Sequence, residues 1–231
     1  MMEETTNVLF SIGPLEITRA VVTMWVMIAV IGVICFLATR KLKDVPGPLQ
    51  NLMEMAITKL RSFFAGNMGE ENARKYFPVM ATFFIFIIVS NYSGLLPGAG
   101  KGFAVPTASL STTLGLGVVS FLTTQVVGMK SRGVGGYLKT FLTPFALMLP
   151  LNLLEQVTRP FSLALRLYGN LYGEEMVTEQ LTHIMPILLP ILMQVMSLLF
   201  CLLQAVVFTM LLSIYLEEAI GEEELHVSVE K

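Results

Sequence analysis

Polar residues recur every three or four positions through one long apolar stretch of the sequence. They are Glu155, Arg159, Ser162, Arg166, Asn170 and Gly173. At 100° per residue these positions share an arc of about 80°, so one face of a helix is polar over about five turns. A charge in the middle of a membrane costs about 2.5–3.5 kcal/mol, so this face must meet water, a partner charge or both.

Arg166 lies among leucines in the segment SLALRLYGN. A guanidinium stays protonated at physiological pH, so Arg166 cannot relay protons by titrating. It can instead favour the ionised form of a carboxylate that comes near it. Glu155 lies three turns away and is poorly placed for repeated exchange, so we infer a mobile carboxylate on a partner. The residues alone predict an ion-translocating membrane subunit with a fixed cation opposite a moving acid.

Carboxylates continue beyond this polar face. Glu175 and Glu179 lie on a different side of the predicted helix, and Glu174 lies between the two sides. The helix can therefore serve two polar environments. The alternative is that residues beyond Gly173 have left the membrane and are simply solvated.

A second polar series follows in the last apolar stretch. Gln194, Ser197, Cys201 and Gln204 are separated by three, four and three residues. Such a series can hydrogen-bond to a neighbouring helix. Two facing polar series in long apolar helices favour the other interpretation, which is a polar path between them.

The composition identifies the environment that holds these residues. The chain has 231 residues, of which 54% are hydrophobic and 14% charged, against about 25% charged in soluble domains. Its mean hydropathy is +0.71, which is typical of a membrane protein. A net charge of -2 excludes a basic nucleic-acid surface. The start of the sequence has no basic region, so we expect no cleaved signal peptide. We also expect no cofactor, no metal ion and no disulfide.

Apolar stretches long enough to span a membrane predict the elements. They cover residues 20–38, 76–96, 110–129, 141–179 and 181–216. The last has about 36 residues and as a helix would reach about 54 Å, against a hydrocarbon core of about 30 Å. Pro186 and Pro190 can bend or start the last helix. We predict an all-α integral membrane protein with about five transmembrane helices, of which the last two are long and strongly tilted.

A further helix is predicted at the membrane surface over residues 47–67. Its apolar residues keep helical spacing on one face; they are Leu49, Leu52, Met53, Ala56, Ile57, Leu60, Phe63 and Phe64. Polar residues occupy the other face, as in a helix that lies in the interface.

Lysine and arginine in the loops predict the orientation. Basic residues near positions 40, 60, 75 and 130 place those loops in the cytoplasm. We expect one membrane domain over residues 1–231. Its parts are an external N-terminus (1–15), the cytoplasmic-side amphipathic helix (47–67), two long ion-pathway helices (142–216) and an acidic cytoplasmic tail (217–231). The protein is expected to be a multi-pass component of the cell (inner) membrane.

One segment resembles a known family. PLNLLEQVTRPFSLALRLYGNLYGEE (150–175) closely resembles the signature helix of subunit a of bacterial F-type ATP synthases, with the specific pattern RP-x5-R-x3-N. NYSGLLPG (91–98) and VPTASLSTTL (105–114) resemble the outer loop and next span of that family, and LLQAVVFTMLLSIYLEEA (202–219) resembles its last helix. The resemblance covers nearly the whole chain.

The resemblance implies a stator subunit beside a rotating c-ring, held with peripheral stalk b subunits in the lipid bilayer. Two half-channels would pass H+ to and from the ring carboxylate and couple ion flow to ATP synthesis, with Na+ as the alternative ion. The subunit would have no catalytic activity by itself. Arg166 matches the essential arginine, and Asn170 and Gln204 match polar residues near it. Glu175 matches the acid of the outer half-channel.

Three departures affect the outer half-channel. Ser109 and Ser111 replace an acid and an amide in the outer span, Ser197 occupies a position that is ionisable in some members, and Glu174 replaces a small residue. The outer carboxylates would then be Glu174, Glu175 and Glu179, with His183 nearby.

Two other classes of protein remain open. A stand-alone membrane ion transporter usually shows internal repeats, and the sequence contains no second copy of the TRPFSLALRLYGN pattern. A passive scaffold would use its polar residues only for contacts between helices.

Overall fold

The computed structural model describes residues 8–12, 15–40, 47–95, 105–142, 149–186 and 188–221. In chain order, the elements are strands β1 (Val8–Ile12) and β2 (Leu15–Thr18), helices α1 (Arg19–Thr39) and α2 (Pro48–Ser93), the short 3-10 helix η1 (Pro106–Ala108), and helices α3 (Leu110–Leu142), α4 (Leu149–Ile184) and α5 (Leu188–Ile220). The predicted all-α membrane class is confirmed. The sequence analysis did not predict the two strands, which pair antiparallel before α1.

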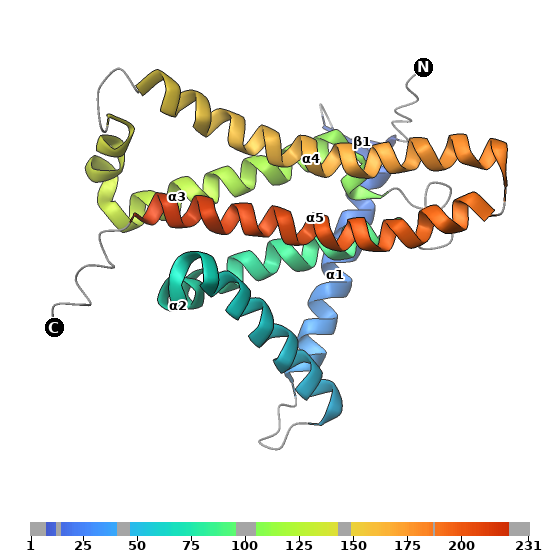
Figure 1. Ribbon diagram of the computed structural model, residues 1–231, viewed down its shortest axis with the longest axis horizontal. Coiled ribbons are helices and arrows are strands. Elements are labelled where there is room, and N and C mark those ends of the chain that lie inside the picture. Colours follow the sequence, from blue (N-terminus) through green and yellow to red (C-terminus); the bar gives the residue numbers. More distant parts are fainter. Residues whose placement is uncertain are drawn as a thin grey trace.

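Four helices contain segments that are long and apolar enough to cross a membrane. Among the described residues these are Arg19–Leu37, Gln50–Ser93, Leu110–Tyr137 and Leu188–Ile220. Helix α4 is not one of the four, and it is the helix that carries the polar face with Arg159 and Arg166. Helix α4 therefore differs in character from the apolar spans, and it packs on α3 and α5 at the edge of the molecule (Figure 1).

Helix α2 joins two elements that the sequence predicted separately. The amphipathic segment and the second span form one 46-residue element, which bends at Gly69 with φ 77° and ψ 161°. Glycine is favoured there because it alone adopts positive φ without steric cost. Arg61 pairs with Glu70 across the bend, and Asn67 Nδ2 donates to Ser213 Oγ of α5 at 3.1 Å. The bend thus docks α2 against α5.

Helices α3, α4 and α5 run lengthwise beside one another, and α1 crosses them steeply (Figure 1). The second half of α2 lies along α5, where the rings of Phe83 and Phe208 stack with centroids 5.9 Å apart. Met80, Ile87 and Leu212 are fully buried in the same core. Much of α1 is exposed and apolar, as expected for a surface that faces lipid.

The two long helices predicted at the end of the chain are present and antiparallel (Figure 1). Helix α4 has 36 residues and α5 has 33. The break between them falls near Met185 and Pro186, so residues 181–184 belong to α4, and α5 continues to Ile220. Residues 1–7, the loop residues Lys41, Lys43 and Lys101, and residues 222–231 of the acidic tail lie outside the described residues.

Candidate functional site

Arg166 projects from α4 and is exposed. Leu163, Ala164 and Leu167 are almost completely buried, so this part of α4 is fixed by its other face. Arg166 forms no hydrogen bond or ion pair with any residue in the described ranges. Its guanidinium is therefore available to a group outside this chain.

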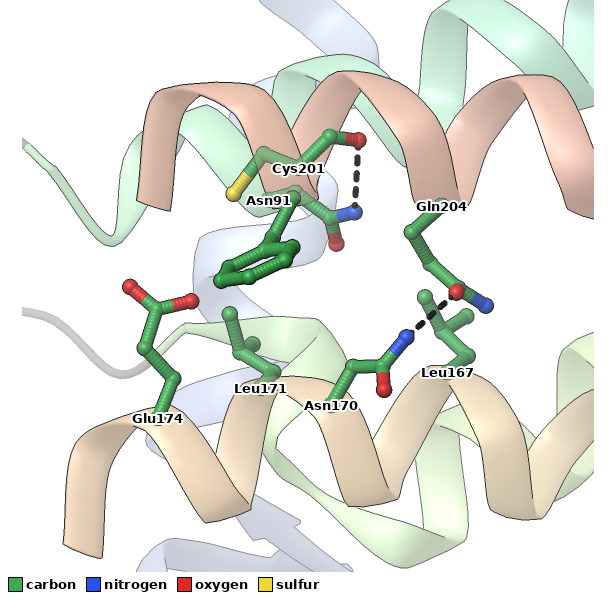
Figure 2. A pocket seen from close by; sticks show the side chains of 8 residues that line it. Asn91, Leu167, Asn170, Leu171, Glu174, Cys201 and Gln204 are labelled. Carbon is green, nitrogen blue, oxygen red and sulfur yellow. Dashed lines mark hydrogen bonds between the residues drawn. The ribbon is translucent and has the colours of Figure 1, made fainter. Parts of the chain in front are cut away.

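Asn170 lies one turn beyond Arg166 and contacts α5. Its Nδ2 donates to Gln204 Oε1 at 2.6 Å (Figure 2). Gln204 is buried, whereas Asn170 is exposed at residue level. The bond joins two residues that sequence analysis placed on facing polar series, and it fixes the position of α4 against α5 beside the arginine.

A pocket opens next to this hydrogen bond, with about 200 Å³ of empty space that reaches the surface. Its lining comes from three helices and consists of Asn91, Leu167, Asn170, Leu171, Glu174, Phe200, Cys201 and Gln204. We call it the α4–α5 pocket. Two buried polar atoms among its lining residues, Asn91 Oδ1 and Gln204 Nε2, have no hydrogen-bond partner among the residues that the structure describes. Buried polar atoms are nearly always satisfied, so the pocket is suited to water or an ion.

The predicted outer carboxylates do not all reach this pocket. Glu174 is half-buried and lines it, whereas Glu175 and Glu179 are exposed and do not. His183 is also exposed, near the end of α4. Glu174 is therefore the predicted carboxylate that shares this pocket with Asn170 and Gln204.

The polar series of α5 divides between two environments. Ser197, Cys201 and Gln204 are buried, and the last two line the α4–α5 pocket. Gln194 is exposed and lies outside it.

A charged cluster lies on the other side of Arg166 along α4. Arg159 Nη2 is 2.7 Å from Glu155 Oε1 and 2.8 Å from Glu218 Oε2 of α5. The Arg159 side chain is only 14% exposed, and its guanidinium carbon lies 4.8 Å from the centre of the Tyr215 ring. This cluster of Glu155, Arg159, Glu218 and Tyr215 ties α4 to α5 and carries one more negative than positive charge.

Amide and phenol groups continue the polar region toward α3. Tyr137 Oη donates to Gln125 Oε1 at 3.0 Å, and Gln125 Nε2 donates to Gln156 Oε1 at 2.9 Å. A second hollow, with about 250 Å³ of empty space, is lined by Gln156, Arg159 and Tyr215 among others. Two hollows with polar groups in their linings therefore lie along α4, one before and one after Arg166 in the sequence.

Comparison with known proteins identifies the family. Residues 21–217 match the family model described as ATP synthase A chain. The chain belongs to this family. It is 36% identical over 220 residues to ATP synthase subunit a 2 of Bradyrhizobium sp., covering 94% of this chain and 95% of the relative. It is 40% identical over 219 residues to ATP synthase subunit a 3 of Pelobacter propionicus, covering 91% and 93% respectively.

The predicted membership is thereby confirmed. Similar identity extends to ATP synthase subunit a of Trichlorobacter lovleyi, with 40% over 208 residues and 88% of each chain covered. This member of the ATP synthase A chain family is an integral membrane protein, in agreement with its four long apolar helices.

Sequence analysis missed several residues of the site in this ATP synthase A chain member. Asn91 was noted only as part of the NYSG segment, and Glu218 was assigned to the acidic tail. Asn91 reaches the site because α2 packs against α5, and Glu218 because the end of α5 packs against α4. Gln125, Gln156 and Tyr215 carried no signal beyond being polar residues in apolar helices.

Proposed function

We propose that this chain is the stator ion-channel subunit of a rotary F-type ATP synthase. The observation that carries the proposal is the exposed Arg166, which has no partner among the described residues and stands on α4 between the segments that line two hollows. Within a membrane, an exposed charge of this kind is costly unless water or an opposite charge meets it. A carboxylate on each passing subunit of the c-ring supplies that charge.

The proposed mechanism is electrostatic. As a ring carboxylate approaches Arg166, the guanidinium favours its ionised form, so the bound ion leaves toward one hollow. Once past Arg166, the carboxylate takes up an ion from the other hollow. Because the arginine keeps its own charge, it also repels cations and prevents direct passage between the two hollows.

Each hollow serves one side of the membrane in this proposal. The α4–α5 pocket forms part of the outer half-channel, with Glu174 as its acid and Asn170 and Gln204 beside Arg166. The cluster of Glu155, Arg159, Glu218 and Tyr215 borders the inner half-channel. Glu175, Glu179, His183 and Gln194, which lie outside the pocket, belong to the outer entrance, and Ser197 supports Cys201 from the preceding turn of α5.

The basic loops support an orientation with the N-terminus outside and the C-terminus in the cytoplasm of the cell (inner) membrane. The exposed apolar residues Phe161 and Leu165 precede Arg166 in the sequence and suit a contact with an apolar ring of helices. The c-ring therefore packs on this face of α4, and the peripheral stalk b subunits bind elsewhere on the chain.

We propose H+ as the coupling ion. Na+ is the second candidate, because the oxygen atoms of Asn91 and Glu174 line the pocket and hard cations take oxygen ligands. ATP hydrolysis by the purified complex at neutral pH, with and without added Na+, separates the two ions. Stimulation by Na+ would replace H+ with Na+ in the proposal.

The central experiment replaces Arg166. Arg166→Ala should leave the complex assembled and abolish ATP synthesis driven by an ion gradient. Arg74→Ala is the matched control, because Arg74 is an exposed arginine on α2. Normal synthesis in Arg166→Ala would refute the stator role, and copurification of the chain without a c-ring would favour a stand-alone transporter or scaffold.

A further inference from the structure

Three groups of different chemistry converge on the α4–α5 pocket. Glu174 of α4 and Cys201 of α5 point into it from opposite sides, and Asn91 enters from α2 (Figure 2). A carboxylate, a thiol and an amide oxygen thus line one small pocket that reaches the surface. None of the described residues that line the pocket is positively charged.

Asn91 gives independent evidence that the pocket takes a ligand. The residue is only 2% exposed, and its Oδ1 has no hydrogen-bond donor among the described residues. Its Nδ2 is held by the carbonyl oxygen of Cys201 at 3.5 Å, which leaves Oδ1 toward the pocket (Figure 2). A buried acceptor in this state calls for a water molecule or a cation.

We propose that Glu174, Cys201 and Asn91 form an inhibitory binding site for a borderline-soft divalent cation of the Zn²⁺ or Cd²⁺ type. Sulfur and carboxylate ligands together suit these ions, which complete their coordination with water. The thiol gives up its proton to solvent as the metal binds. Mg²⁺ and Ca²⁺ are not selected, because they require more oxygen ligands than the pocket offers.

Binding has a defined consequence for the chain. One ion held by Glu174 and Cys201 links α4 to α5 directly beside the Asn170–Gln204 hydrogen bond. Such an ion occupies the pocket and stops other ions from reaching Arg166. This consequence rests on the proposed function of the pocket as part of the outer half-channel, whereas the binding itself does not.

The first experiment measures binding without using ion transport. In the purified complex with Cys35→Ser, Cys201 is the remaining cysteine of this chain, and its modification by N-ethylmaleimide is followed by mass spectrometry of the subunit. Cd²⁺ should slow this modification at least tenfold, and Mg²⁺ should not. Glu174→Gln should remove the protection, whereas Glu175→Gln, its exposed neighbour, should retain it.

Several outcomes would overturn the site. Equal Cd²⁺ protection in Glu174→Gln and Glu175→Gln would show that the thiol binds metal without the pocket. Absence of protection, or failure of the reagent to reach Cys201 without metal, would show that no accessible site exists. Asn91→Leu gives a second test, because it leaves the ligands Glu174 and Cys201 in place. This change should weaken the protection of Cys201 by Cd²⁺.

The second experiment measures ATP-driven ion pumping in vesicles, with each variant compared with its own rate without metal. Cd²⁺ should inhibit the Cys35→Ser complex, and the additional Cys201→Ser change should raise the half-inhibiting concentration at least tenfold. Protection of Cys201 with unimpaired pumping would keep the metal site and remove the pocket from the proposed ion path. If Cd²⁺ does not protect Cys201 but pumping still depends on Arg166, the metal site is overturned and the proposed function stands.

Discussion

Arg159 of α4 and Glu218 of α5 form an ion pair between residues 59 positions apart, with one guanidinium nitrogen 2.8 Å from Glu218 Oε2 and 2.9 Å from Oε1. Glu155 shares the same guanidinium, and the Tyr215 ring covers it. The arginine is largely buried, but both carboxylates are more than half exposed. The pair therefore acts chiefly as a contact that holds α4, the helix of Arg166, against α5.

Removing the Glu218 charge should weaken the contact between α4 and α5. Glu218→Gln leaves Arg159 paired with Glu155, so we expect a loss of about 1 kcal/mol, typical of a solvent-screened pair. The apparent melting temperature of the complex should fall by about 2–4 °C. Retention of this subunit in the heated complex measures the effect. Glu217→Gln is the control, and an equal decrease in that variant would rule out a specific pair.

The Asn170–Gln204 hydrogen bond should couple the two residues energetically. Asn170→Leu leaves the acceptor oxygen of the buried Gln204 without its donor, and Gln204→Leu leaves the Asn170 amide without the bond that orients it, so each should slow pumping. The double variant should be less impaired than the sum of the single effects, with a coupling of about 1 kcal/mol. Pumping rates are measured for the original protein, the two single variants and the double variant. Strictly additive effects would show that the hydrogen bond does not matter for transport.

Helical periodicity predicted which residues share a face, but not which helix meets that face. It placed Arg159, Arg166 and Asn170 correctly on one side of a long helix because the spacing alone fixes their angles. It could not decide between Glu174 and Glu175, which differ by 100° around α4, because the packing of α5 determines which one lines the pocket. Asn91 and Glu218 depended on contacts across more than 50 residues of chain, on which local spacing has no bearing.

Glu174 and Glu175 should therefore differ in their effect on transport. Glu174→Gln removes the carboxylate that lines the α4–α5 pocket, so we expect pumping to slow about tenfold, equivalent to about 1.4 kcal/mol. Glu175→Gln changes an exposed side chain and should alter the rate less than about twofold. Initial pumping rates in vesicles with equal amounts of complex give the comparison. If Glu175→Gln slows pumping more than Glu174→Gln, then Glu175 is the acid of this half-channel, as the family resemblance implies.

Gly117 should be required for the close approach of α3 and α4. A side-chain carbon at this position would lie 2.7 Å from the carbonyl oxygen of Pro160 and 3.3 Å from Cβ of Ala164. Gly117→Ala forces the two helices apart, and we expect a loss of about 1–3 kcal/mol, as in other overpacked sites. Gly115→Ala is the matched control on the same helix, since nothing lies within 4 Å of its new carbon. Yield and thermal stability of the assembled complex should fall only for Gly117→Ala.

Arg166→Lys should fail to restore coupling although it retains a positive charge. Lysine lacks the planar fork that can hold both oxygens of a carboxylate, and it loses its proton more readily in a desolvated site. A neutral amine no longer forces the ring carboxylate to release its ion, so synthesis should remain below about a tenth of the original rate, a deficit above about 1.4 kcal/mol. ATP synthesis in vesicles energised by an ion gradient measures this, alongside assembly of the complex. Near-normal synthesis in Arg166→Lys would show that charge alone is sufficient and that the shape of the guanidinium has no role.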